Sequence, residues 1–187
     1  RSSGKMGYAI ARAAAAQGAR VILISGPVSL AEPHGVEVLQ VQTAEEMYAA
    51  AHAHVSEADI FIAAAAVADY RPAAPAEFKI KKTDAEMSIA LLRSADILAS
   101  VAALDDGPFT VGFAAETNDV EKYARGKLEN KNLDMIVANR VGSDCGFDVD
   151  ENTVEVFWDG GEQAFPTAAK TELASQIIEL VADRYGR

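Results

Sequence analysis

Three lysines stand within four positions, at Lys79, Lys81 and Lys82, in a chain of 187 residues whose formal net charge is −11. Grouped cations oppose the field of an acidic protein unless they face an anion. Each lysine ammonium can neutralise phosphate oxygens as a point charge. The cluster therefore predicts a polyphosphate site, with a solvated basic stretch on a strand or loop as the alternative reading.

Two further lysines, Lys127 and Lys131, lie four positions apart in a segment with helical periodicity. Residues four apart share one face of a helix. Together with Lys79, Lys81 and Lys82, they could surround a triphosphate from two sides. The alternative is that Lys127 and Lys131 are ordinary solvated helix charges.

Four segments stand at predicted strand ends or helix starts, where open α/β sheets bind their ligands. They are residues 63–69, Ala95 to Leu98, residues 112–118, and Ala138 to Arg140. The alanines of the first segment would let a ligand approach the backbone closely. The start of a helix at Ala95 to Leu98 would offer free N–H groups to an anion. Close packing explains alanine-rich strands equally well, and Asp69 could be only a turn residue before Pro72.

Apolar runs bounded by turn residues predict the strands, and apolar residues at helical spacing predict the helices. The predicted strands are Arg20 to Ser25, Val36 to Val41, Ile60 to Ala66, Phe109 to Ala114 and Met135 to Asn139, with a β-like arm at Phe78 to Lys82 and Met87 to Leu92 and a hairpin at Val154 to Trp158 and Glu162 to Phe165. The predicted helices run from Tyr8 to Gln17 behind a cap at Ser2 or Ser3, from Thr43 to Ser56, from Ser94 to Leu104, from Asn118 to Asn130 and from Thr167 to Tyr185. This alternation predicts an α/β fold: a doubly wound, mostly parallel, Rossmann-like sheet with a β-arm and a C-terminal hairpin plus helix, in one domain over residues 1–187.

Composition narrows the class of protein. The 17 basic residues are outnumbered by 28 acidic ones, and such a surface does not suit nucleic acid or an anionic membrane. No apolar run reaches the length of about 18 residues that a membrane span needs. One cysteine, Cys145, excludes an internal disulfide and suits a reducing cytosol, so we expect a cytoplasmic protein.

Two phosphate-binding motifs are incomplete in this chain. Ser3-Gly4-Lys5 resembles the tail of a P-loop, but Met6 follows the lysine in place of a hydroxyl residue. No Gly-x-Gly-x-x-Gly follows a predicted strand, which counts against an NAD(P)-binding Rossmann domain. The dehydrogenase class remains an alternative only through its shared fold class.

The order of several short motifs resembles the bacterial phosphopantothenoylcysteine synthetase family, the ligase domain of the bifunctional coenzyme A biosynthesis flavoprotein. The matching segments are residues 2–7 (SSGKMG), 25–27 (SGP), 65–70 (AAVADY), 79–82 (KIKK), 112–117 (GFAAET) and 131–134 (KNLD). The resemblance covers nearly all of the chain. It implies a ligase in which the carboxylate of 4′-phosphopantothenate attacks the α-phosphate of CTP, and L-cysteine then displaces CMP from the acyl-cytidylate.

The resemblance also implies roles for individual residues. Ala63, Ala64 and Ala65 resemble the backbone platform for CTP, and Ala66 and Asp69 resemble substrate contacts, with Asp69 also near the nucleotide. Lys79 resembles the catalytic triphosphate lysine on a flap-like arm. The remaining CTP contacts implied by the family are Ala95, Asp96, Ile97, Leu98, Phe113, Lys127 and Lys131.

The family further implies Mg²⁺ held largely by the substrate phosphates, with no protein ligand cluster and no FMN in this part of the protein. It implies a homodimer in which the lysine-bearing arm crosses the interface, and fusion to a preceding flavin-dependent decarboxylase. An asparagine expected just before Arg1, and the family's first strand, are not in the sequence. Their absence leaves a non-catalytic nucleotide-binding module as a further alternative.

Overall fold

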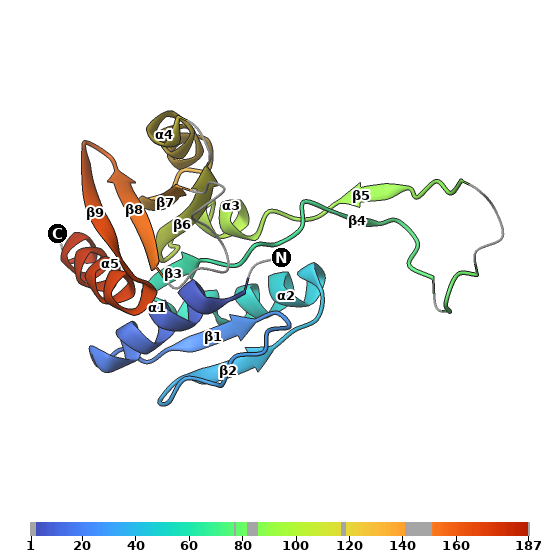
Figure 1. The fold of residues 1–187 in the computed structure, drawn as a ribbon, viewed down its shortest axis with the longest axis horizontal. Helices are drawn as coiled ribbons and strands as arrows, with labels where there is room; N and C mark the ends of the chain where they lie inside the picture. The colour runs from blue at the N-terminus through green and yellow to red at the C-terminus, as the bar shows by residue number, and fades with distance from the viewer. Residues whose placement is uncertain (1–2, 77, 82–85, 117–118, 141–150, 187) are drawn as a thin grey trace.

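The computed structural model describes residues 3–76, 78–81, 86–116, 119–140 and 151–186. Helices and strands alternate along the first two thirds of the chain, as Figure 1 shows, and a hairpin and a long helix follow. The helices are α1 (Lys5–Ala16), α2 (Ala44–His54), the 3₁₀ helix η1 (Val55–Glu57), α3 (Ile97–Ala102), α4 (Val120–Asn130) and α5 (Lys170–Tyr185). The strands are β1 (Ile22–Ser25), β2 (Glu37–Gln40), β3 (Ile60–Ala63), β4 (Tyr70–Pro72), β5 (Leu91–Arg93), β6 (Phe109–Glu116), β7 (Met135–Arg140), β8 (Glu151–Trp158) and β9 (Gly161–Ala169).

The central sheet has five strands in the order β3-β6-β7-β8-β9. β3, β6 and β7 run parallel, and β8 and β9 add an antiparallel hairpin at one edge. β1 and β2 form a separate parallel pair. Among the described residues, β1 has no strand partner on the side away from β2, and β3 has none on the side away from β6. The predicted α/β class, with its parallel strands and C-terminal hairpin plus helix, is confirmed.

Helices cover both faces of the central sheet, which makes the fold doubly wound. On one face, α1 and α5 pack against alternate residues such as Val111, Met135 and Val137. On the other face, α4 packs against Ile136 and Ala138, with α3 at its side. All four of Met135, Ile136, Val137 and Ala138 are fully buried, as expected for a central parallel strand that is covered on both sides.

A close approach at Gly112 explains why β6 has no side chain there. A Cβ at this position would lie 2.9 Å from Leu133 Cδ1 and 3.0 Å from Leu98 Cδ2. Nearby, the Asp134 carboxylate accepts hydrogen bonds from both the amide and the hydroxyl of Thr110, at 2.7 and 2.9 Å. These contacts fix how β7 enters the sheet beside β6.

Helix starts and ends follow local chemistry in some places only. The predicted capping box of α2 is confirmed, because Thr43 Oγ1 accepts from the Glu46 amide and Glu46 accepts from the Thr43 amide. The predicted serine cap of α1 is wrong for Ser3. Gly4 is the N-cap, with a positive φ of 77° that favours glycine, and Ser2 lies outside the described residues.

Several predicted boundaries are corrected by pairing between strands. The closing helix begins at Lys170 and not at Thr167, because residues up to Ala169 stay in the ladder with β8. The strand predicted to reach Ala66 ends at Ala63, where its pairing with Gly112 stops. The predicted start of α4, Asn118, lies outside the described residues, as do Lys82 and Cys145.

The arm is confirmed, but its strands differ from those predicted. β4 and β5 pair antiparallel at its root, with Tyr70 opposite Arg93. Residues 78–81 of the first predicted strand form no strand, and in the second predicted strand only Leu91 and Leu92 belong to β5. Figure 1 shows the arm projecting away from the body of the molecule. No helix in the described ranges combines the length and apolar character needed to cross a membrane.

Candidate active site

The predicted alanine platform lies where β3 leaves the sheet. Ala63 ends the strand beside Gly112 and is half-buried, as is Ala64, while Ala65 and Ala66 are exposed. The first turns of α1 run alongside, since a Cβ on Gly7 would lie 3.7 Å from the Cβ of Ala64. The backbone after β3 is therefore open to a ligand and flanked by α1.

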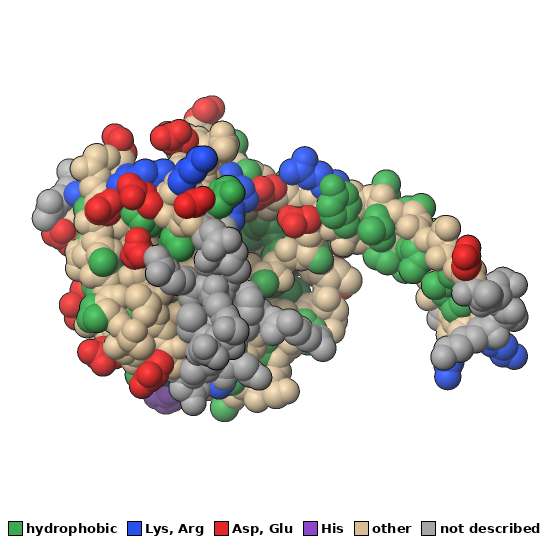
Figure 2. All heavy atoms as spheres, turned by 45° about the horizontal axis from the view of Figure 1, so that its top comes forward, with side chains coloured by type: hydrophobic (Ala, Val, Ile, Leu, Met, Phe, Trp, Pro, Cys, Tyr) green, Lys and Arg blue, Asp and Glu red, His purple; other side chains and the backbone are tan. Residues whose placement is uncertain are grey.

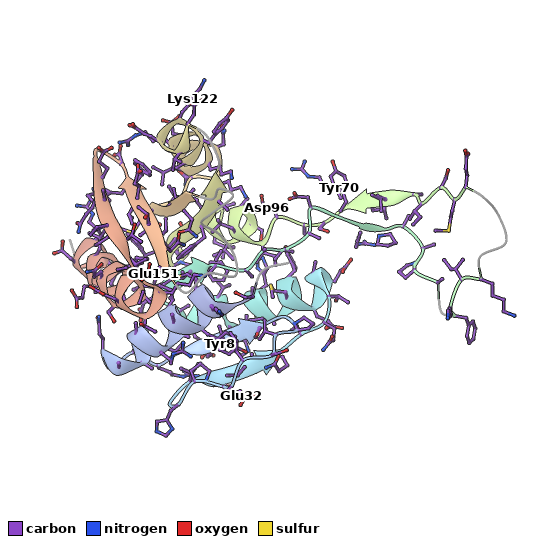
Figure 3. All side chains as sticks on the ribbon, viewed as in Figure 1. Tyr8, Glu32, Tyr70, Asp96, Lys122 and Glu151 are labelled. Carbon is purple, nitrogen blue, oxygen red and sulfur yellow. The ribbon has the colours of Figure 1, made fainter. Side chains whose placement is uncertain are left out.

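Two of the predicted site residues, Asp96 and Lys131, form an ion pair of 2.8 Å. Asp96 is the N-cap of α3, where its Oδ1 accepts a hydrogen bond from the Ala99 amide at 3.0 Å. Lys131 is the C-cap of α4, so the pair joins the ends of two helices. Figure 3 shows Asp96 near the point where the arm leaves the body.

The pKa of Asp96 lies below its ordinary value. Burial acts to raise this pKa, but it is outweighed by the hydrogen bond from Lys131, the hydrogen bond from the Ala99 amide, and the positive charges of Lys131 and Arg93. The carboxylate therefore stays ionised at neutral pH and already caps α3. An anionic ligand approaching this helix start would meet a negative charge and a lysine that can turn toward it.

The other residues of the predicted helix-start segment differ in exposure. Ala95 is exposed, but Ile97 is buried and Leu98 packs under α3 against the layer of β6, β7 and α4. Their side chains hold α3 on the sheet. Any contact of Ile97 or Leu98 with a nucleotide would have to come from the backbone.

Phe113 and Lys127 have different surroundings. Phe113 is half-buried and packs against the core layer under α1 and α5. Lys127 is exposed on α4, one turn before Lys131. Lys127 and Lys131 thus lie one turn apart at the C-terminal end of α4, as their spacing predicts. The Phe113 side chain points instead to the face of the sheet that α1 and α5 cover.

Asp69 and Lys79 belong to the arm. The Asp69 carbonyl accepts the Ser94 amide at 2.8 Å, which closes the root of the arm, and the Asp69 side chain is exposed. Arg71 forms an ion pair with Glu45 of α2 and so fixes the root against the body. Lys79 is exposed in the distal part of the arm, where Figure 2 shows blue side chains at the tip. Within one chain, the structure does not bring Lys79 to Lys127 and Lys131.

The structure also marks two residues that were not among the predicted site residues. Buried side-chain atoms without a hydrogen-bond partner among the described residues are Ser94 Oγ, Asn139 Oδ1 and Gln176 Oε1. Ser94 lies just before the predicted segment Ala95 to Leu98, and Asn139 lies within the predicted segment Ala138 to Arg140, although neither was given a role of its own. Ser94 also lines a cavity of about 120 Å³ with Ala44, Glu45, Tyr48 and Ala95. Their positions next to a helix start and a strand end were the available sequence signals.

No group of three or more His, Cys, Asp or Glu side chains that could hold a metal ion occurs in the described part of the chain. Asp69 and Asp96 are separate carboxylates near the platform and the helix start. A divalent cation here would need most of its oxygen ligands from a bound phosphate.

Comparison with known families decides the relationship. Residues 1–185 match the family described as DNA/pantothenate metabolism flavoprotein C-terminal domain. The chain belongs to this family. The predicted resemblance to bacterial phosphopantothenoylcysteine synthetase is thereby confirmed.

Over the aligned residues, relatives are about 50–55% identical to the chain. The coenzyme A biosynthesis bifunctional protein CoaBC of Vibrio parahaemolyticus is 55% identical over 182 residues, which cover 95% of this chain and 46% of that protein. CoaBC of Escherichia coli K12 is 50% identical over 189 residues, covering 98% of this chain and 47% of that protein. The chain thus spans about half the length of these relatives.

Two solved structures have the same fold as this chain. The crystal structure of the C-terminal domain of CoaBC superposes with a TM-score of 0.81 at 40% identity, covering 96% of this chain and 82% of that one. A mutant of Cab2 in complex with phosphopantothenate-cysteine superposes with a TM-score of 0.77 at 16% identity, covering 100% of this chain and 79% of that one. The second likeness concerns the fold alone.

Proposed function

We propose that the chain is a CTP-dependent ligase that joins 4′-phosphopantothenate to L-cysteine in coenzyme A biosynthesis. The observation that carries the proposal is the identity of 50–55% with CoaBC proteins over nearly the whole chain. The exposed platform after β3 and the lysines of α4 and the arm supply the kind of site that a nucleoside triphosphate requires.

The proposed reaction has two steps. A carboxylate oxygen of 4′-phosphopantothenate attacks the α-phosphorus of CTP, the bond to the β-phosphate breaks, and pyrophosphate leaves. The amine of cysteine then attacks the acyl carbon, loses a proton, and displaces CMP as the amide forms. Negative charge grows on the leaving pyrophosphate in the first step, so lysine ammonium groups placed there lower the barrier.

The residues divide between the two ligands. We assign the backbone at Ala63, Ala64 and Ala65 to CTP, and Ala66 with Asp69 to the acyl substrate. We assign the neutralisation of the phosphate charge to Lys79, Lys127 and Lys131, with Lys79 nearest to the reacting atoms. The further nucleotide contacts are the backbone at Ala95, Asp96, Ile97, Leu98 and Phe113. The phosphates of CTP would hold Mg²⁺, which would neutralise part of their charge, and the two steps need no FMN.

The arm supports a homodimer. Its apolar side chains are exposed, with Phe78 at 83% and Met87 at 64%, and Figure 2 shows them along its length. Extended apolar surface of this kind marks an interaction site. A second copy that covers the arm would also receive Lys79 beside its own Lys127 and Lys131, which one chain alone does not bring together.

Two further expectations complete the proposal. The family's first strand would lie parallel between the unpaired edges of β1 and β3 and would join the two sheets. The family's asparagine would then stand at the start of α1. Fusion to a flavin-dependent decarboxylase and a cytoplasmic location follow the same family pattern.

Pyrophosphate release tests the function. The ligase should release pyrophosphate from CTP only when 4′-phosphopantothenate is present, and should form the amide only when cysteine is added. Binding of CTP without release would favour a non-catalytic nucleotide-binding module. Hydride transfer with a nicotinamide cofactor, without pyrophosphate release, would favour the dehydrogenase alternative.

Mixed chains test the arm. Lys79→Ala and Lys131→Ala chains, each impaired alone, should regain about one quarter of wild-type activity after random mixing if each arm serves the partner's site. In that case half of the dimers pair one intact arm with one intact body. Lack of any recovery in a confirmed mixed dimer would show that each arm serves its own chain.

A further inference from the structure

Asn139 carries a polar group that has no partner among the described residues. It stands at the next-to-last position of β7, between Ala115 of β6 and Val154 of β8 in the two ladders. Its Oδ1 is buried and has no hydrogen-bond partner among the described residues. A buried acceptor left unpaired costs roughly 1–3 kcal/mol, so most buried polar groups in proteins are paired.

The alternation of β7 tells which side of the sheet Asn139 faces. Val137 and Met135, two and four positions earlier, belong to the core layer under α1 and α5, whereas Ile136 and Ala138 face α4. Side chains two apart in a strand share a face. Asn139 therefore points to the α1 side, whereas Asp96 and Lys131 join the ends of α3 and α4 on the other side.

The α1 side is open next to Asn139. Ala115, its neighbour in the ladder, is exposed, although Val111 and Phe113 earlier on the same strand are covered. Met6 in the first turn of α1 packs against the same layer, and α1 also runs beside Ala64. An acyl substrate at Ala66, just past the alanine platform, would thus approach the sheet edge that carries Asn139.

The chemistry of an amide oxygen limits what it can bind. It carries no charge and accepts a hydrogen bond from an N–H or O–H group, and it repels the oxygens of a phosphate. In the proposed reaction, 4′-phosphopantothenate offers an amide N–H and a free hydroxyl, and CTP offers the amino group of its base and the hydroxyls of its ribose, while the triphosphate has no such donor. Asn139 lies on the α1 side of the sheet, away from the ends of α3 and α4 where Asp96 and Lys131 meet, and this position favours the acyl substrate.

We propose that Asn139 is a positioning residue for the acyl substrate: its amide oxygen accepts a hydrogen bond from an N–H or O–H of 4′-phosphopantothenate on the α1 side of the sheet. This inference rests on the ligase function proposed above. It assigns the two faces of the sheet edge to different substrates, with the phosphates of the nucleotide on the side of α3 and α4.

Asn152 offers a matched control, because it is an asparagine on the neighbouring strand whose amide oxygen is paired. It lies near the start of β8, is 6% exposed, and its Oδ1 accepts the Thr153 amide at 3.0 Å. Replacing Asn152 removes a made hydrogen bond, whereas replacing Asn139 removes an unpaired acceptor. The two changes should therefore differ in their effect on stability as well as on kinetics.

The experiment measures steady-state kinetics and the melting temperature of the ligand-free protein for Asn139→Ala, Asn139→Leu and Asn152→Ala. For both Asn139 variants, kcat/KM for 4′-phosphopantothenate should fall about tenfold or more, the KM for CTP should change less than about twofold, and the melting temperature should hold or rise. Asn152→Ala should lower the melting temperature and leave the KM values unchanged. Calorimetric titration with 4′-phosphopantothenate alone should show the same loss of affinity in the Asn139 variants.

Other results overturn the inference. If both Asn139 variants melt earlier, as Asn152→Ala does, with unchanged kinetics and binding, Asn139 is a structural residue. A rise confined to the KM for CTP would place it on the nucleotide side. If the wild-type protein neither turns over nor binds 4′-phosphopantothenate, the proposed function fails first and this inference fails with it.

Discussion

The Asp96–Lys131 pair allows a sharp test of the site's electrostatics. Asp96→Asn keeps a side-chain oxygen that can accept the Ala99 amide, because asparagine caps helices as well as aspartate does. The change removes the charge and the Oδ2 acceptor that face Lys131 Nζ at 2.8 Å. Asp96→Ala removes both the cap and the charge, so the two variants separate the two contributions.

The exposure of the pair sets the expected magnitude. The side chains of Asp96 and Lys131 are 39% and 32% exposed, so solvent screens their attraction strongly. Partly exposed ion pairs contribute about 0.5 kcal/mol, and loss of an N-cap costs about 1 kcal/mol. We expect Asp96→Asn to lower the free energy of unfolding by about 0.5 kcal/mol and Asp96→Ala by about 1.5 kcal/mol.

Urea unfolding with a double-mutant cycle is the assay. Asp96→Asn, Lys131→Met and the double variant should give a coupling energy of about 0.5 kcal/mol that shrinks in high salt. Because the pKa of Asp96 is lowered in the folded protein, its stabilisation is full above the unfolded value of about 3.9. The advantage of the wild type over Asp96→Asn should therefore vanish as the pH falls through the folded pKa. Equal losses in the two Asp96 variants, or an advantage that grows in acid, would refute the reasoning.

The same variant probes catalysis. The Asp96 carboxylate competes with phosphate for the Lys131 ammonium, so Asp96→Asn should lower the KM for CTP by about twofold while leaving the KM for cysteine unchanged. Asp105→Asn, at an exposed position outside the site, is the control. A raised KM for CTP would instead show that the carboxylate itself supports nucleotide binding.

Four other substitutions test the packing and the arm. Gly112→Ala should lower the free energy of unfolding by about 1–3 kcal/mol, because the new Cβ would lie 2.9 Å from a Leu133 methyl. Gly126→Ala, on α4 with nothing within 4 Å, should raise it by about 0.5–1 kcal/mol, and equal effects at the two glycines would contradict this explanation. Thr110→Val should lower it by about 1–3 kcal/mol in urea unfolding, because it removes the hydroxyl that pairs with Asp134. Lys79→Ala should raise the activation free energy by about 2–4 kcal/mol with an unchanged melting temperature, and wild-type kinetics would remove Lys79 from the mechanism.

Local signals predicted the elements better than their ends. The Thr43 capping box needs only neighbouring residues, and it appears as predicted. The start of α5 depends on how far β9 pairs with β8, which is a contact between distant segments, and the prediction was wrong by three residues. The serine cap failed for a similar reason. Gly4 approaches Val28 so closely that a Cβ would lie 2.8 Å from its side chain, and no local pattern shows this contact.

The candidate site was predictable as segments but not as geometry. The spacing of Lys127 and Lys131 and the alanines after β3 pointed to the right stretches of chain. The pairing of Asp96 with Lys131 joins residues 35 positions apart and followed from no motif. The unpaired oxygens of Ser94 and Asn139 could be recognised only after every other hydrogen bond of their surroundings was in place.

The sequence by itself determined the α/β class, the order of the strands and helices, and the family, because hydrophobic period, turn residues and ordered motifs are properties of neighbouring residues. The tertiary structure decided which charges meet, which face of the sheet Phe113 and Asn139 occupy, and how far the arm carries Lys79 from the lysines of α4. Those outcomes depend on long-range pairing and packing, where one residue of register turns a side chain to the opposite face.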